Sequence, residues 1–240
     1  MRLKDMDIVY PYKDDGNDGR ELRYSLRTVA KNVPHRNVVI IGQAPTRLNT
    51  KEVKFIPYED SAALKYENVR WKILNIFHNK DISKDFIWMN DDMLIIKPID
   101  KIPPYSWWTL QFHADKIEKR SGHSSYWHIL NKTNKLFHNE GFSYECHTPF
   151  IFNKDNLMSL FDMYGEELRW CALRSVYGNN FCKPSFFEEE FWRVDCKSYS
   201  GRRDEMWDLK DLTYISTYDE IKYAYAKRLD ANFEKCIYEL

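Results

Sequence analysis

Residues 37–42 have the sequence NVVIIG, four β-branched side chains in a row that end at a glycine. A continuous apolar run of this length is typical of a strand that is buried on both faces of a parallel sheet. Similar strand patterns and two amphipathic helix patterns surround it, at residues 6–10, 53–58 and 85–89 and at residues 22–33 and 67–80. This alternation of strand and helix predicts a three-layer α/β fold with a mostly parallel sheet.

The second half of the chain is less regular. Its patterns predict helices at residues 124–138, 155–164, 166–177 and 219–229, and strands at residues 93–99, 150–152, 192–196 and 212–215. No internal repeat, linker or low-complexity segment interrupts the pattern. We therefore expect residues 1–240 to form one domain.

The composition excludes several classes of protein. The chain has 36 basic and 36 acidic residues, so its formal net charge is zero and it lacks the basic excess of a dedicated nucleic-acid binder. No apolar stretch is long enough to span a membrane, and the first residues do not resemble a targeting segment. The five cysteines show no metal-clip or redox spacing. We expect buried free thiols in a cytoplasmic protein.

The stretch with the most chemical information is residues 86–94, FIWMNDDML. An apolar strand ends in Asn90, Asp91 and Asp92, and a second apolar segment follows at once. Adjacent carboxylates repel, so a cation would explain their position at the carboxyl end of a strand, where α/β sheets bind ligands. Oxygen ligands suit Mg²⁺ or Mn²⁺. An ordinary Asx turn between two strands is the alternative.

Other polar residues lie where the same edge of the sheet is expected. Asp14 and Asp15 follow the first strand and could hold a ribose or a base, or belong to a solvated loop. His147 precedes the strand at residues 150–152 and could complete a metal site or act as an acid or base. Glu189, in an acidic run, is a candidate general base, although such runs are usually solvated. The chain has no Walker sequence, no G-x-G-x-x-G run and no nucleophile elbow.

Several of these segments resemble the Stealth proteins, bacterial sugar-phosphate transferases of capsule synthesis. The resemblance begins with DIVY at residues 7–10, DGND at residues 15–18 and ELRYSLR at residues 21–27. It continues with a segment around residues 41–49, with MNDDM at residues 89–93 and with HTP at residues 147–149. The order of these motifs is kept over about residues 6–153. The chain is shorter than is usual for that family and resembles a compact relative, similar to glycosyltransferase-like proteins of bacteria and their phages. The resemblance therefore implies the cytoplasm of a bacterium or of a phage-infected cell.

The resemblance implies a nucleotide-sugar-binding fold of the GT-A kind, with residues 1–100 as the nucleotide- and metal-binding half and residues 101–240 as the acceptor-side half. It implies a D-x-D-like site for Mn²⁺ or Mg²⁺ and a catalytic group. The expected metal ligands are Asn90, Asp92 and His147. The expected donor-binding residues are Tyr10, Asp14, Asp15, Arg23, Arg27, Asn90 and Asp91. The expected catalytic residues are Asp91, His147 and Glu189.

The function expected on these grounds is metal-dependent transfer of a sugar from a nucleotide-activated donor, a UDP-sugar above others, to an acceptor. Transfer of a sugar-1-phosphate from the same donor is one alternative, and a non-catalytic module that binds a nucleotide or glycan is another. Two kinds of acceptor are left open: a glycan and a modified base of phage DNA. A basic cluster near the C-terminal third could follow a DNA backbone, and its members are Lys197, Arg202, Arg203 and Lys210.

Overall fold

The computed structural model describes residues 2–14, 19–45, 47–61, 65–106, 108–186, 213–216 and 229–240. These residues group into two compact units. The first contains the described residues up to 102, residues 147–151 and the described residues from 213 onward. The second contains residues 103–146 and 152–186. The prediction of a single domain whose halves meet at residue 100 stays a prediction.

The central sheet has five strands in the order β3-β2-β1-β4-β7. Their bounds are β1 Asp7–Tyr12, β2 Val38–Gly42, β3 Val53–Pro57, β4 Asp85–Trp88 and β7 Phe150–Asn153. The pairs β1–β2, β1–β4 and β2–β3 are all parallel. Every residue of β2 is buried, as its unbroken β-branched sequence predicts. The mostly parallel α/β sheet expected from the sequence is therefore confirmed.

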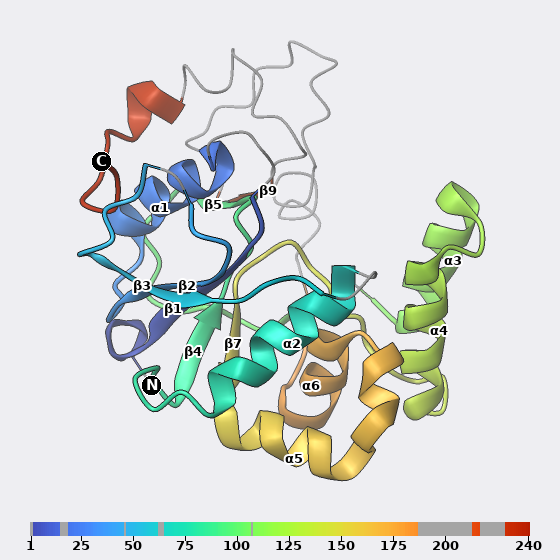
Figure 1. Ribbon diagram of the computed structural model, residues 1–240. Coiled ribbons are helices and arrows are strands. Elements are labelled where there is room, and N and C mark those ends of the chain that lie inside the picture. Colours follow the sequence, from blue (N-terminus) through green and yellow to red (C-terminus); the bar gives the residue numbers. More distant parts are fainter. Residues whose placement is uncertain are drawn as a thin grey trace. The chain divides into compact units, whose positions relative to one another are not determined.

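Two helices connect these strands. Helix α1 (Arg20–Asn32) joins β1 to β2, and helix α2 (Lys65–Phe77) joins β3 to β4. The two connections run in opposite directions across the sheet, so right-handed crossovers place the helices on opposite faces, as Figure 1 shows. Helix α1 buries Leu22, Leu26 and Val29 completely. The spacing of these three residues is the apolar stripe from which the sequence predicted this helix.

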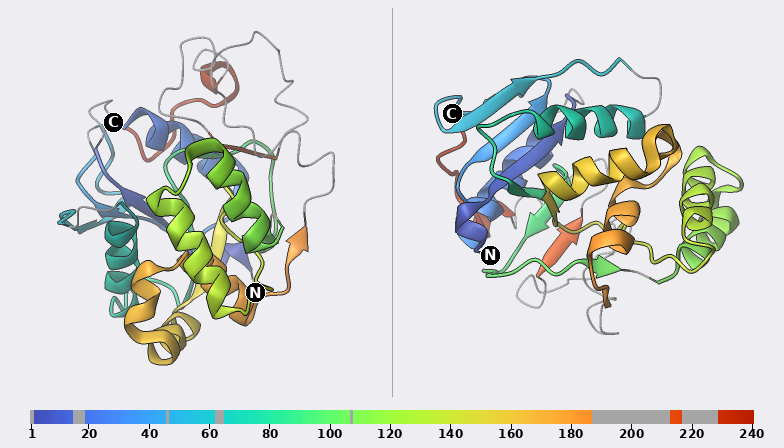
Figure 2. Two further views of the ribbon diagram at one scale, coloured as in Figure 1. Left: turned by 90° about the vertical axis from the view of Figure 1, so that its right-hand side faces the viewer. Right: turned by 90° about the horizontal axis from the view of Figure 1, so that it is seen from below.

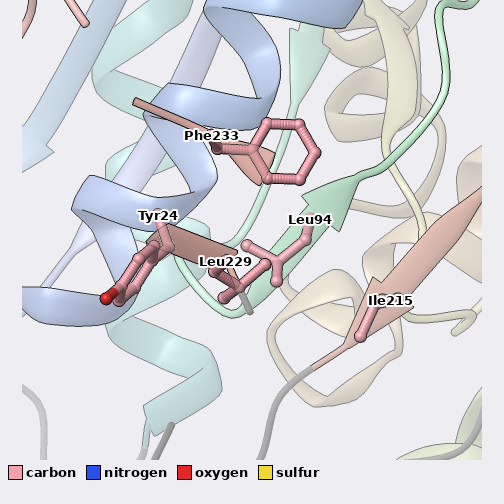
Figure 3. Close-up of a cluster of buried hydrophobic side chains, with 5 residues drawn as sticks. All are labelled: Tyr24, Leu94, Ile215, Leu229 and Phe233. Carbon is pink, nitrogen blue, oxygen red and sulfur yellow. The ribbon is translucent and has the colours of Figure 1, made fainter. Parts of the chain in front are cut away.

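A short antiparallel pair of strands, β5 (Met93–Ile95) and β9 (Tyr214–Ser216), lies beyond the turn that follows β4. In its register Met93 faces Ser216. An apolar cluster supports the pair, formed by Tyr24, Leu94, Ile215, Leu229 and Phe233 (Figure 3). The C-terminal segment thus packs against α1 and against both strands of this small sheet.

The second unit is largely helical. It contains α3 Leu110–Ser121, α4 Ser125–Leu136, α5 Lys154–Tyr164, a 3-10 helix at Gly165–Trp170, α6 Leu173–Phe181, and the short parallel strands β6 Tyr105–Ser106 and β8 Ser185–Phe186. Helices α3 and α4 lie side by side as a hairpin (Figure 2). Thr109 and Ser124 begin these helices, since each side chain accepts a hydrogen bond from a backbone N–H of the first turn.

Some predicted elements differ from the structure. Helix α3 was not predicted from the sequence, although Leu110, Ala114 and Ile117 are buried at helical spacing. The single helix predicted over residues 166–177 is wrong, because the chain is extended at Ala172, whose N–H donates to Thr133 Oγ1 at 2.8 Å. The strand predicted over residues 93–99 ends at Ile95.

Other predictions fall partly or wholly outside the described residues. The strand at residues 192–196 and nearly all of the helix at residues 219–229 lie there, and the described helical residues near it are Leu229 to Asn232. Cys146, Cys171, Cys182 and Cys236 are free thiols. Within the described part of the chain, every helix is too short or too polar to cross a membrane.

Candidate active site

The turn between β4 and β5 carries the predicted acidic site. The Met89 N–H donates to the Val9 carbonyl at 3.0 Å, so β4 stays aligned with β1 up to the edge of the sheet. The Met93 N–H then donates to the Asn90 carbonyl at 3.2 Å and closes the turn. Asn90, Asp91 and Asp92 are half-buried. The turn therefore presents two carboxylates and an amide at the carboxyl end of a buried parallel strand.

His147 lies beside this turn, as the sequence analysis expected of a metal ligand or an acid–base group. Its Nδ1 is 3.5 Å from Asp92 Oδ2. The imidazole side chain is 51% exposed and the Asp92 side chain 21% exposed. The two residues are thus close together and both retain access to solvent, which a ligand would need.

Ser216 is the third member of this cluster, and sequence reasoning missed it. Its Oγ lies 3.0 Å from His147 Nδ1 and 3.2 Å from Asp92 Oδ2. The antiparallel register of β5 and β9 brings Ser216 opposite Met93, next to Asp92. The strand predicted at residues 212–215 stopped one residue short of it. No local pattern marks a serine at a strand end as part of a site that is 124 residues away.

The donor set of this cluster fits a divalent cation. Asp92 supplies carboxylate oxygen and His147 supplies imidazole nitrogen, a combination that suits Mn²⁺ well and Mg²⁺ through the oxygen. Among the described residues no three His, Cys, Asp or Glu side chains converge. A cation at this turn would therefore take its remaining ligands from the Asn90 amide, from water and from substrate phosphates, as is usual for Mg²⁺ and Mn²⁺.

The carboxyl ends of β1 and β2 are packed tightly together. Gly42 has a φ of +140°, and a Cβ at this position would lie 1.9 Å from the Tyr12 carbonyl oxygen. Lys72, only 3% exposed, pairs with Asp60 at 2.8 Å and donates to the same Tyr12 carbonyl at 3.2 Å. The sequence analysis did not identify this lysine, because it lies among the apolar residues of α2. The Lys72 ammonium therefore neutralises the Asp60 carboxylate.

Asp14 is exposed, and its backbone N–H donates to Gln43 Oε1 at 2.7 Å. This bond ties the segment after β1 to the segment after β2. Asp14 therefore stays accessible at the carboxyl edge of the sheet, and its role in donor binding remains a prediction. Asp15 and Glu189, the other acidic candidates, lie outside the described residues, as does the basic cluster of Lys197, Arg202, Arg203 and Lys210.

Tyr10 lies inside the core, and its predicted contact with a donor stays a prediction. It is fully buried in β1, and its hydroxyl lies 2.9 Å from Ser25 Oγ, which itself donates to the Met93 carbonyl. Burial raises the pKa of the Tyr10 phenol far above its usual value, despite the Ser25 hydrogen bond. The side chain therefore ties β1 and α1 to the start of β5 from inside the core.

The two arginines predicted to bind a donor phosphate differ. Arg27 binds Glu239 through Nε at 2.6 Å and Nη2 at 2.9 Å, and Asp230 through Nη1 at 2.7 Å. Glu239 is 1% exposed, so Arg27 holds the C-terminal segment in place, and its role as a donor ligand stays a prediction. Arg23, one turn earlier, has a buried Nε with no hydrogen-bond partner among the described residues. It remains a candidate for an anionic ligand.

No protein-family model matches the chain. An exopolysaccharide phosphotransferase of Streptomyces coelicolor is 34% identical in an alignment 88 residues long, and the alignment covers 33% of this chain and 15% of that protein. The match thus covers a small part of the relative. The solved structure of galactosyltransferase LgtC in complex with donor and acceptor sugar analogues aligns with a TM-score of 0.53 and 10% identity, covering 96% of this chain and 97% of that one.

These comparisons confirm two predictions made from the sequence. Over the segment that aligns, the chain is similar to the exopolysaccharide phosphotransferase, as its resemblance to sugar-phosphate transferases led us to expect. Its α/β fold, with the mostly parallel sheet, is that of the GT-A glycosyltransferases. The similarity to LgtC extends over nearly the whole chain, whereas the sequence identity to the phosphotransferase is local.

Proposed function

We propose that this protein is an enzyme, a metal-dependent glycosyltransferase that moves a sugar from a nucleotide-activated donor to an acceptor. The observation that carries the proposal is the contact of Asp92 with His147 at the carboxyl end of β4. In α/β sheets this edge is where ligands bind. An accessible carboxylate and imidazole there form a site for a cation and for the diphosphate of a donor.

In this proposal Asp92 and His147 hold Mn²⁺ or Mg²⁺, with Asn90 as a further ligand. The bound cation supplies charge neutralisation for the departing nucleotide. Asp91, in the same turn, contacts the donor sugar or ribose. The remaining proposed donor contacts are Asp14, Asp15 and Arg23, and Glu189 is the proposed general base. A UDP-sugar is the proposed donor, and a glycan is the proposed acceptor, with a base of phage DNA as the alternative.

Transfer of a sugar-1-phosphate is the second candidate, and the local identity to the exopolysaccharide phosphotransferase favours it. Both reactions use the same donor and the same cation. They differ in the bond that breaks: the bond from the anomeric carbon to oxygen in glycosyl transfer, or the bond between the two phosphates in sugar-phosphate transfer. The mass of the product separates them, because only the second reaction leaves a phosphate on the acceptor.

A donor screen tests the proposal. The thermal midpoint of the protein would be measured with UDP-, GDP-, CMP- and TDP-linked sugars, each with and without Mn²⁺. A ligand at 100 times its dissociation constant stabilises by about 2.7 kcal/mol, which corresponds to a rise of roughly 5–10 °C for a chain of this size. We expect one donor to raise the midpoint with Mn²⁺ present and to be consumed on addition of a glycan acceptor.

Two variants make the screen specific to the site. Asp92→Ala should lose the Mn²⁺-dependent rise, whereas Asp115→Ala, which removes an exposed carboxylate from α3, should keep it. A donor that binds without ever being consumed would favour the non-catalytic binding module. Absence of any Mn²⁺-dependent shift with all four donors would contradict the proposed function.

A further inference from the structure

Helix α3 carries two stripes of residues with the same spacing. One stripe is buried, and its members are Leu110, Ala114 and Ile117. The other begins two residues later and is exposed, and its members are Phe112, Lys116 and Lys119. A step of two residues corresponds to about 200° around an α-helix. The exposed stripe therefore lies on the side of α3 opposite its buried stripe.

Two aromatic rings lie at the beginning of the exposed stripe. Phe112 is 44% exposed, and Trp108, just before the helix, is 41% exposed. Their ring centroids are 4.0 Å apart and their planes meet at 88°. In this arrangement the edge of one ring covers a face of the other. The pair thus forms a compact apolar projection, whereas a platform for stacked bases needs open ring faces.

The same hairpin carries a local excess of positive charge. Over residues 108–137, which include α3 and α4 (Figure 2), the sequence has five basic and two acidic residues, although the whole chain is neutral. Helix α4 contains no acidic residue. All five basic side chains are exposed, and they are Lys116, Lys119, Arg120, Lys132 and Lys135. The hairpin therefore favours an anionic partner.

Exposed apolar side chains elsewhere in the second unit lack this charge. Helix α5 exposes Met158 and Met163 by 48% and 53%. Its exposed charged residues are Asp155 and Asp162, which an anionic partner would repel. Helix α3 thus differs from α5 in joining exposed apolar rings with cations on one face. A partner that matches both features is negatively charged at its surface and apolar beneath it.

We infer that the face of α3 formed by Trp108, Phe112, Lys116 and Lys119 docks on an anionic lipid surface. Tryptophan and phenylalanine side chains enter the boundary between headgroups and acyl chains. The two lysines meet the lipid phosphates, and each lysine near an anionic membrane raises affinity about fivefold. The helix lies on the surface of the bilayer in this arrangement. The inference is independent of the proposed function, because it uses neither the acidic turn nor a donor.

Flotation of the protein with lipid vesicles tests the inference. The vesicles are phosphatidylcholine alone, or equal parts of phosphatidylcholine and phosphatidylglycerol. We expect binding to the anionic vesicles at low salt, little binding to the neutral ones, and release at high salt, because salt screens the lysines. Lys116→Glu with Lys119→Glu should weaken binding roughly 30-fold, since two such cations are lost. Trp108→Ala with Phe112→Ala should weaken it roughly tenfold through lost apolar burial.

Two matched variants control for charge and for apolar area. Lys4→Glu with Lys101→Glu makes the same change in net charge at exposed positions of the first unit. Met158→Ala with Met163→Ala removes exposed apolar side chains from α5. Both should bind anionic vesicles as the wild type does. Circular dichroism checks that each variant is folded, and the lysine variant decides the test if the aromatic one does not fold.

Three results would overturn the inference. The first is absence of binding to anionic vesicles at low salt. The second is equal binding by the wild type and both α3 variants, since the lipid contact would then lie elsewhere. The third is binding to duplex DNA that the α3 variants lose while no vesicle binds, because the same face would then meet a nucleic acid. A failed donor screen would leave the vesicle result unchanged.

Discussion

The two ends of the parallel sheet each hold an aspartate, and the two carboxylates have opposite surroundings. At the amino end, Asp7 is completely buried and accepts from Arg36 at 2.8 and 2.6 Å, from Asn37 at 2.8 Å and from the Ser83 N–H at 2.8 Å. At the carboxyl end, Asp92 is partly exposed and accepts from the Ser216 hydroxyl at 3.2 Å.

The difference shows that an aspartate can stabilise the fold at the amino end of the sheet and belong to a candidate ligand site at the carboxyl end. Burial by itself would raise the pKa of Asp7, but hydrogen bonds from Arg36, Ser83 and Asn37 outweigh it and leave the pKa below its ordinary value. The Asp7 carboxylate is thus paired and hydrogen-bonded inside the fold. Asp92 contacts the Ser216 hydroxyl and lies 3.5 Å from the exposed His147 imidazole, so it lies in a polar, partly solvated site rather than in a closed ion pair with an arginine.

The largest effect is expected at the carboxyl end. Asp92→Ala should lower the rate of donor consumption by about 10²–10³-fold, the usual cost of removing a group that stabilises charge in the transition state. Its free energy of unfolding should fall by about 1 kcal/mol, since its partly exposed side chain loses the hydrogen bond from Ser216. The rate is measured at saturating Mn²⁺ and the stability by urea denaturation. A rate equal to that of the wild type would remove Asp92 from the proposed site.

At the amino end we expect a large loss of stability and little loss of activity. Asp7→Ala leaves several buried donors without their acceptor, and it should lower the free energy of unfolding by roughly 2–4 kcal/mol. The thermal midpoint should fall by about 5–12 °C. Activity per folded molecule should be retained. Loss of donor binding in a folded Asp7→Ala protein would show that the two ends of the sheet are not independent.

The stability that Asp7 contributes should also depend on pH. A carboxylate whose folded pKa lies below its unfolded value of 3.8 stabilises the protein above that value, and this contribution is lost as the pH falls through the folded pKa. The difference in unfolding free energy between the wild type and Asp7→Asn should therefore be constant near neutral pH and narrow below about pH 4. Denaturation at a series of pH values measures it. A difference that grows on acidification would contradict the lowered pKa.

The smallest effect is expected for Tyr10, which lies on the same strand as Asp7 and closer to the carboxyl end. Tyr10→Phe removes a buried hydroxyl that contacts Ser25, and it should cost about 1 kcal/mol. Ser25 keeps its bond to the Met93 carbonyl. Donor affinity should be unchanged, because the side chain is enclosed by the core. A clear loss of donor affinity with little loss of stability would instead support the predicted contact of Tyr10 with the donor.

Much of the first unit could be predicted from local sequence. Strands β1, β2 and β4, helix α1 and the polar turn at residues 90–92 follow from apolar periodicity over a few residues and from residue types that favour turns. Helix α3 carried the same kind of signal, in Leu110, Ala114 and Ile117, and could have been found. The break at Ala172 could not, since the hydrogen bond that the Ala172 N–H donates to Thr133 Oγ1, 39 residues away, stabilises it.

The candidate site divides in the same way. Its acidic turn was visible in the sequence because a strand that ends in Asn90, Asp91 and Asp92 is a local event. Arg27 and Arg23 share one helix and similar surroundings in sequence, yet only Arg27 meets Glu239, 212 residues further along the chain. The residues near Arg27 in the sequence do not indicate that it pairs with Glu239. The local pattern therefore could not distinguish an arginine that stabilises the fold from one that could bind a ligand.

The sequence by itself determined the alternation of strands and helices, the parallel sheet and the presence of a polar turn at the end of β4. These features depend on the spacing of apolar side chains within one element. That spacing follows directly from the side-chain periods of the helix and the strand. Only the tertiary structure decided which polar groups meet at that turn. Ser216 reaches Asp92 and His147 because β9 pairs with β5 and the C-terminal segment packs behind them. Such contacts depend on the packing of the whole chain rather than on any local pattern.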